Sequence, residues 1–133
     1  MKNVNELIAT MFGKVFTSVT KTDYALCFEN ATEKYRFEHR QECCEEVQIE
    51  DVVGDLQDLV GNPITFAEKS SNVEDPGPKD KYDDYVWTYY KFATVKGWVD
   101  VRWYGSSNGY YSMGVDLTYT GPDGESETAF SDE

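Results

Sequence analysis

The residues best suited to metal or nucleophile chemistry lie in one short segment, 39–45, which reads His-Arg-Gln-Glu-Cys-Cys-Glu. Imidazole and thiolate groups are zinc ligands, and the spacing of His39 and Cys43 would let both approach one ion. Structural zinc sites, however, draw on paired clusters such as Cys-x2-Cys, and adjacent cysteines point in different directions. His39, Cys43 and Cys44 are therefore weak metal candidates. We expect instead that His39 fills a corner between two elements and that the cysteines act as small buried hydrophobic residues.

Enzymatic chemistry has little support in the sequence. A cysteine nucleophile needs a lowered thiol pKa, and the acids around Cys43 and Cys44 would raise it. No glycine-rich phosphate loop, Ser/His/Asp arrangement or paired-carboxylate motif stands out. The sequence predicts a protein that is not an enzyme and that carries no cofactor. A small zinc-binding protein or metal-dependent enzyme stays as an alternative.

A second group of candidates lies in segment 82–111, which contains all three tryptophans. If Lys96-Gly97 is the turn of a two-residue hairpin, alternate residues of its strands face the core, beginning with Thr94 paired with Val99. The opposite face then pairs Lys91 with Arg102, and it also carries Trp98. Two cations directly opposite one another are unfavourable by roughly 0.2 to 1 kcal/mol unless an anion lies between them.

This outward-facing set has a structural and a functional interpretation. In the structural one, Asp100 and acids of neighbouring elements neutralise the two bases, and helices cover the aromatic rings. In the functional one the set binds a partner or ligand, because Trp, Tyr and Arg are enriched at binding hot spots. A nucleotide would also fit, with its base on a ring and its phosphate on Arg102. The predicted partner- or ligand-binding residues are Trp87, Tyr89, Lys91, Arg102 and Tyr104.

The N-terminal part must position these residues through a helix and three strands. Segment 4–12 has apolar residues at helical spacing and is followed by Gly13, which predicts a short amphipathic helix. Segments 14–20, 24–29 and 34–40 are typical of strands. Leu26 and Phe28 share one face with Tyr24, and Tyr35 and Phe37 share one face with His39.

From Cys43 the apolar period changes to that of a helix, which we expect to end at Gly61-Asn62-Pro63 and to be interrupted at Gly54. Its acidic residues would form an exposed face. This face is either solvated surface or a mimic of nucleic acid that occupies a basic groove on another protein. The residues of the predicted acidic face are Glu45, Glu46, Glu50, Asp51, Asp55 and Asp58.

The remaining segments complete an α+β prediction. Segment 64–67 is a short strand, segment 68–84 a mobile loop around Pro76-Gly77-Pro78, and segment 126–133 a flexible tail. Alternation from Tyr111 to Tyr119 predicts another strand. We expect a single domain over 1–133, with an antiparallel meander sheet of about six strands and two short helices on or beside it.

Charge and composition exclude several function classes. The chain has 25 acidic and 12 basic residues and a net charge of -13, which disfavours direct binding to duplex nucleic acid and to anionic membranes. No segment has the pattern of a signal peptide or a membrane span. Three cysteines, two of them adjacent, fit a reducing compartment better than a disulfide framework. The sequence predicts a soluble, cytoplasmic protein.

Two segments carry a resemblance: HRQECCEEVQIEDVVGDLQDLVGNPI and WTYYKFATVKGWVDVRWYGSSNGYYSMGVD. They resemble a family of small proteins of unknown function found in bacteriophages and prophages, over residues 23–117. The resemblance implies a phage or mobile-element origin, a bacterial host cytoplasm and an α+β fold. It assigns no activity to particular residues.

These observations lead to a functional expectation. The chain is predicted to be a phage-encoded, non-enzymatic binding protein that inhibits a host factor through an acidic and aromatic surface, plausibly in an antiviral defence such as CRISPR. One alternative is sequestration of a signalling nucleotide, with Lys91 and Arg102 on the phosphate. An exposed aromatic sheet face also makes a homodimer an open expectation.

Overall fold

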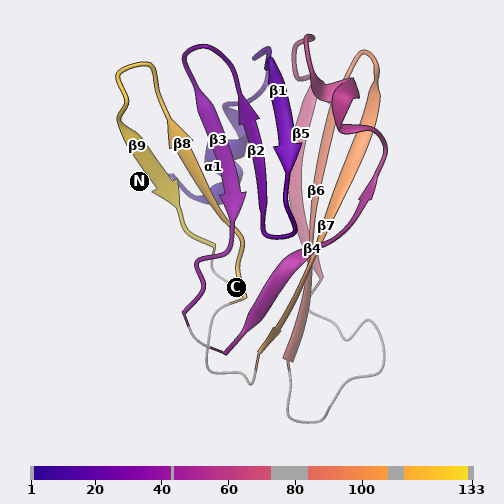
Figure 1. Cartoon of the computed structure of the whole chain (residues 1–133), viewed down its shortest axis with the longest axis vertical. Coiled ribbons are helices and arrows are strands. Elements are labelled where there is room, and N and C mark those ends of the chain that lie inside the picture. Colours follow the sequence, from indigo (N-terminus) through magenta and orange to yellow (C-terminus); the bar gives the residue numbers. More distant parts are fainter. Residues whose placement is uncertain (1, 43, 73–83, 108–112, 132–133) are drawn as a thin grey trace.

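The computed structural model describes residues 2–42, 44–72, 84–107 and 113–131. Within these residues the chain is mostly β, with two antiparallel sheets, one short α-helix and one 3-10 turn (Figure 1). The five-stranded sheet has the order β1 (Ser18–Lys21), β2 (Ala25–Glu29), β3 (Lys34–Glu38), β8 (Asp116–Thr120) and β9 (Ser126–Ala129). The four-stranded sheet has the order β4 (Glu46–Val53), β7 (Gly97–Ser107), β6 (Asp84–Thr94) and β5 (Phe66–Asn72). The antiparallel pairing is confirmed, but the α+β class with one sheet and two helices is wrong.

The N-terminal elements agree with the sequence pattern. Helix α1 spans Val4–Ala9 and begins at a capping box, in which Asn3 accepts a hydrogen bond from the backbone N–H of Glu6 and the Glu6 side chain accepts one from Asn3. This reciprocal pair satisfies two N–H groups that the first helical turn leaves free. Strands β2 and β3 lie within their predicted segments, 24–29 and 34–40, and differ from them by at most two residues at either end. Strand β1 begins four residues later than the predicted segment 14–20 and ends one residue after it.

The hairpin of β6 and β7 has the predicted faces but a different register. Its turn residues are Val95 and Lys96, and Gly97 already belongs to β7, paired with Thr94. The register therefore differs by two residues from the predicted one. Because side chains alternate with a period of two, a shift of two leaves every residue on its predicted face.

Strand β4 replaces the predicted acidic helix. Val47 and Ile49 alternate as in a strand, but a β-bulge between Ile49 and Asp51 adds a residue, so the next partly buried residue is Val52. A spacing of three after a spacing of two imitates helical periodicity. The strand then bends at Gly54, which has φ +106 and leads into the 3-10 turn η1 (Leu56–Leu59).

Two further segments also differ from the sequence pattern. Residues up to Asn72 of the predicted mobile loop 68–84 belong to β5, and residue 84 begins β6; residues 73–83 lie outside the described residues. The predicted flexible tail 126–133 contains β9, which pairs with β8 through residues 126–129. Only Ala129 of this strand is buried, so the apolar pattern that predicts a strand is missing.

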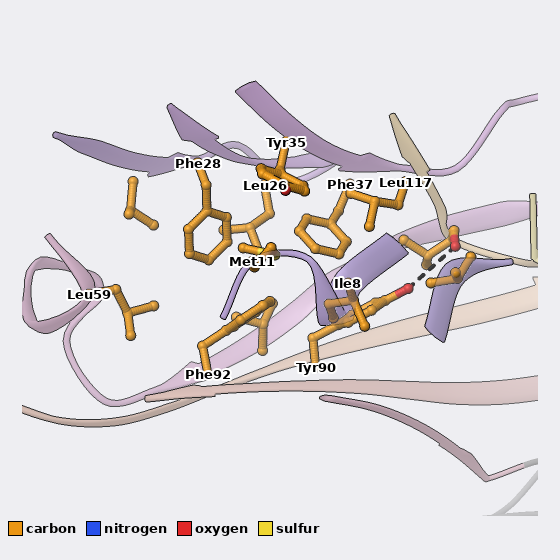
Figure 2. Packing of buried hydrophobic residues seen from close by; sticks show 14 of the residues in the cluster. Ile8, Met11, Leu26, Phe28, Tyr35, Phe37, Leu59, Tyr90, Phe92 and Leu117 are labelled. Atoms are coloured by element: carbon orange, nitrogen blue, oxygen red, sulfur yellow. Dashed lines mark hydrogen bonds between the residues drawn. The ribbon is translucent and has the colours of Figure 1, made fainter. Parts of the chain in front are cut away.

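The hydrophobic core lies between the two sheets (Figure 2). The ring centroids of Phe28 and Phe92 are 4.7 Å apart, and those of Phe37 and Tyr90 are 4.8 Å apart, so rings of β2 and β3 contact rings of β6. The apolar side of α1 and Leu59 of η1 belong to the same core. Both helical elements therefore pack into the core rather than onto the far side of the four-stranded sheet.

Candidate functional site

The candidate site is the outer face of the four-stranded sheet, meaning the face turned away from the core. The cross-strand register places its side chains in rows that cross all four strands. Two adjacent rows carry the charged residues. From β4 through β7 and β6 to β5 they are Asp51, Arg102, Tyr89 and Ser70 in one row and Val53, Asp100, Lys91 and Glu68 in the next.

Aromatic side chains flank this charged band on both sides. On one side, Trp98 contacts Phe66 with ring centroids 5.0 Å apart, and Trp98 is 57% exposed. On the other side, Tyr104 contacts Trp87 at 4.6 Å and Tyr85 at 5.5 Å. The outer face is thus a strip of alternating charges between two aromatic clusters.

The charged band is hollowed into a concavity of about 460 Å³, within the size range of ligand pockets. Each of the four strands contributes to its lining. The lining residues are Asp51, Val53, Phe66, Glu68, Ser70, Tyr89, Lys91, Asp100 and Arg102.

Each cation of the band lies beside an acid. Lys91 Nζ is 3.7 Å from Asp100 Oδ1, and Arg102 Nη2 is 3.7 Å from Asp51 Oδ2. The predicted pairing of Lys91 with Arg102 is wrong, because the register shift places Asp100 opposite Lys91 and Tyr89 opposite Arg102. Both ion pairs are about half exposed, and exposed pairs contribute only about 0 to 1 kcal/mol. These side chains can exchange partners at little cost.

The cations also lie over aromatic rings. Lys91 Nζ is 5.6 Å from the centroid of Trp98, and the Arg102 guanidinium carbon is 4.9 Å from that of Trp87. Arg102 Nε and Trp87 Nε1 are shielded from solvent and have no hydrogen-bond partner. The outer face therefore holds cations over rings and leaves two N–H donors unsatisfied.

All five predicted binding residues lie on this face: Trp87, Tyr89, Lys91, Arg102 and Tyr104. Their role in binding stays a prediction. Asp51 was predicted only as part of an acidic helix face, and the other residues that β4 and β5 add to the concavity were missed. The reason is that β4 was predicted as a helix and β5 beyond residue 67 as a loop. Residues 66–72 have no apolar/polar alternation that would have indicated a strand, and β5 is defined by its pairing with β6.

The six residues of the predicted acidic face do not form one surface. Glu45 is buried, Asp51 lies in the concavity, and Asp55 caps η1 by accepting a hydrogen bond from Gln57 N. The backbone carbonyl of Asp58 accepts a hydrogen bond from the Thr94 hydroxyl. Glu46 and Glu50 are exposed. The helix that would have aligned all six is absent.

His39 fills a buried corner between β3 and β4, as expected from the sequence. Its Nε2 lies 2.7 Å from Glu45 Oε2, and its Nδ1 lies 2.7 Å from the carbonyl oxygen of Gly114. Since a carbonyl only accepts, Nδ1 carries a proton and donates it. Glu45 also accepts from the backbone N–H of Glu42 at 2.9 Å. Both ring nitrogens are thus held by protein groups, which makes His39 a structural link.

Cys27 and Cys44 differ from the expectation that the cysteines act as small buried hydrophobic residues. Cys44 is exposed and disulfide-bonded, whereas Cys27 is a half-buried free thiol that accepts a hydrogen bond from Arg36 Nη1 at 3.2 Å. Cys43 lies outside the described residues. A disulfide sulfur is not a thiolate ligand, and within the described part of the chain no group of three or more His, Cys, Asp or Glu residues is placed to hold a metal ion.

A separate polar cluster lies at one edge of the core. Lys14 Nζ donates to Glu33 Oε2 at 2.5 Å and to Tyr35 Oη at 2.8 Å, and the Tyr119 hydroxyl also donates to Glu33. These two donors lower the pKa of Glu33, with the hydrogen bond from Lys14 as the larger cause. The hydrogen bond to Glu33 also raises the pKa of Tyr119. The cluster has satisfied partners, so we assign it to stability.

The chain belongs to a family described as Domain of unknown function (DUF7448), whose model matches residues 6–117. No curated protein and no solved structure is similar enough to count as a match. Among the described residues, no helix has the length and apolar character needed to cross a membrane. The family match covers every strand of the outer face, and it assigns no function to that face.

Proposed function

We propose that this protein is a non-enzymatic binding protein whose outer face of the four-stranded sheet contacts another protein. The observation that carries the proposal is the concavity lined by all four strands and flanked by aromatic clusters. Interface centres are enriched in Trp, Tyr and Arg, and large exposed apolar groups beside a polar band are typical of binding surfaces.

Exposed apolar residues at one end of the outer face support contact with a macromolecule. Val53 is 61% exposed and Trp98 57% exposed, and Val95 in the adjoining turn is 78% exposed. Phe66 packs against Trp98 beside them. Burying such groups in a partner's surface would favour binding, because removing apolar area from water contributes about 25 cal/mol per Å² before the costs of association are subtracted.

The charge arrangement favours a protein over a nucleotide. A phosphate needs an uncompensated cation, but Lys91 faces Asp100 and Arg102 faces Asp51. Glu68 adds a third carboxylate to the same concavity. Sequestration of a nucleotide is therefore the weaker proposal. It gains its support from the unsatisfied donors of Arg102 and Trp87.

The finer form of the proposal is that the partner is a host factor of an antiviral defence and that binding inhibits it. This form rests on the resemblance of two segments to phage and prophage proteins. A non-enzymatic binding protein would inhibit stoichiometrically, by covering a surface that its target needs. Inhibition complete at one chain per target would support it.

Capture from a bacterial lysate tests the proposed surface. Immobilised wild-type protein is compared with Trp98→Ala, and with Phe12→Ala as a matched control, because Phe12 is 69% exposed but follows α1, outside the outer face. We expect one protein to be retained by wild type and by Phe12→Ala, and lost with Trp98→Ala. Equal retention by all three would contradict the proposal. Stabilisation by a nucleotide with no protein retained would favour sequestration.

A further inference from the structure

We infer that the occupant of the concavity is a basic segment of the partner, with an Arg or Lys side chain seated beside Glu68. This inference rests on the proposed function, because it names the chemistry of the partner at the same face. It draws on the balance of charge in the concavity, on the surroundings of Glu68, and on the rings that flank it.

The concavity carries an uncompensated negative charge. Its lining has three carboxylates, of Asp51, Glu68 and Asp100, against the two cations of Lys91 and Arg102. Each cation has its own acid at 3.7 Å. An incoming cation would therefore neutralise the remaining charge, whereas an incoming anion would add to it.

Glu68 supplies that charge. It is exposed, and within the described part of the chain it has no ion pair or hydrogen bond to its carboxylate. Lys91 is its cross-strand neighbour, but the Lys91 ammonium is directed to Asp100 and over the ring of Trp98. The Glu68 carboxylate is thus left to accept hydrogen bonds from a partner.

Aromatic rings beside the carboxylates favour a side-chain cation over a metal ion. Phe66 is next but one to Glu68 on β5 and lines the same concavity, with Trp98 in contact with it. The chain already places its own cations over Trp98 and Trp87 on this face. A guanidinium group can stack on a ring and donate two parallel hydrogen bonds to a carboxylate, so arginine suits this surrounding best.

Long-range electrostatic attraction also favours a basic partner. The net charge of -13 accelerates encounter with a basic surface, and this effect weakens with added salt. It acts on any basic partner, however, and does not select the concavity. A test must therefore separate attraction to the whole molecule from seating beside Glu68.

The test is the affinity of a fluorescein-labelled octa-arginine peptide, measured by anisotropy for the full chain at low and moderate salt. Glu68→Gln is compared with Glu125→Gln, a control with the same change in net charge at the exposed β8–β9 turn, outside the concavity. We expect Glu68→Gln to weaken binding by about three- to fivefold, as for loss of a half-exposed ion pair. We expect Glu125→Gln to leave the affinity within about a factor of 1.5, since only screened long-range attraction changes.

One further variant and one further peptide keep the result interpretable. Lys91→Gln should strengthen peptide binding by about two- to fivefold, because it frees Asp100 and removes a like charge from the concavity. An octa-glutamate peptide should not bind measurably at the same concentrations. Equal weakening by Glu68→Gln and Glu125→Gln, or no response to Lys91→Gln, would overturn the inference.

Failure of the inference is distinguishable from failure of the proposed function. If a lysate protein is retained in a Trp98-dependent way but octa-arginine does not displace it, the face binds a protein through other groups and the basic occupant is wrong. If retention does not depend on Trp98, the proposed function itself is wrong. Displacement by octa-arginine, but not by octa-glutamate or ADP-ribose, would support both.

Discussion

The two faces of the β6–β7 hairpin carry the same kinds of residue for different purposes. On the inner face, Tyr90, Phe92 and Trp103 are at most 1% exposed and contact the opposite sheet or belong to its core. On the outer face, Trp98 is 57% exposed, and Tyr89 and Tyr104 are half-buried. Aromatic content alone therefore does not separate stability from recognition. The position within the alternation does.

The two faces also differ in charge. Over residues 86–94 of β6 and 97–107 of β7 the inner face carries no charged residue, whereas the outer face carries acids and bases across all four strands. Removing an inner side chain should lower stability, and removing an outer one should lower binding.

The largest effect is expected from Phe92→Ala on the inner face. Phe92 is fully buried and contacts the rings of Phe28 and Phe37, so its loss leaves a cavity between the sheets. Comparable substitutions cost about 3 to 5 kcal/mol. Urea unfolding followed by tryptophan fluorescence measures the change. A loss under about 1 kcal/mol would mean that the sheets do not pack face to face as described.

The next effect is expected from Gly54→Ala, at the bend after β4. A Cβ there would lie 2.5 Å from the backbone oxygen of Trp98, and Gly54 has φ +106. Strain of this kind costs about 1 to 3 kcal/mol. The variant should be less stable than wild type. The backbone around Trp98 should also be displaced, which would change the tryptophan emission. Unchanged unfolding would argue against the bend that ends β4.

The polar cluster around Glu33 should give a pH-dependent effect of intermediate size. The pKa of Glu33 is lowered from its ordinary value of 4.5, first by the hydrogen bond from Lys14 and then by that from Tyr119. Its contribution to stability is therefore complete above pH 4.5 and is lost as the pH falls through the lower folded-state pKa.

Urea unfolding of wild type and Glu33→Gln at pH 7 and pH 3 isolates this contribution. We expect wild type to be the more stable protein at pH 7, and the difference between the two to shrink at pH 3. A difference that is the same at both pH values would show that the carboxylate charge of Glu33 is not what the cluster stabilises.

Trp98→Ala should have a small effect on stability despite the size of the side chain. Trp98 is more than half exposed and contacts Phe66 and Lys91. We expect a loss below about 1.5 kcal/mol, limited to the ring contact and partial burial. Thermal unfolding measures it. A loss as large as that of Phe92→Ala would place Trp98 in the core and remove the contrast between the two faces.

The smallest effect is expected from the ion pair of Lys91 and Asp100. A double-mutant cycle with Lys91→Ala and Asp100→Ala should give a coupling energy of about 0.2 to 1 kcal/mol, decreasing with salt. A coupling well above this range would mean that the pair is a fixed structural element. Its side chains would then not be available to a partner.

The sequence predicted which side chains of the β6–β7 hairpin point inward and which point outward, but not the cross-strand register. Hydrophobic alternation along Tyr90, Phe92 and Val101 determines which side chains point inward, and a two-residue register shift preserves this alternation. The predicted turn included Gly97, but Gly97 is the first residue of β7. It is required instead by its φ of +157 and by the approach of Asp58, whose carboxylate oxygen would lie 3.1 Å from a Cβ.

Other features depend on contacts that sequence periodicity does not contain. The bulge in β4 gives apolar spacings that match a helix, and only pairing with β7 reveals the strand. Strand β9 has one buried residue and is defined by pairing with β8. The contribution of Val53, Phe66 and Glu68 to the concavity was therefore missed, and Asp51 was predicted only as part of an acidic helix face, whereas Tyr89, Lys91 and Arg102 were identified.

The most direct test uses the indole N–H resonances of the three tryptophans in a titration with octa-arginine, followed by ¹H–¹⁵N NMR. Trp87 and Trp98 lie on the outer face, and Trp103 lies in the core and is an internal control. We predict saturable shifts of Trp87, Trp98 and the backbone of outer-face residues, with Trp103 unchanged. Shifts that leave Trp87 and Trp98 unaffected, or that cluster at the β8–β9 turn, would contradict the assignment of this face to binding.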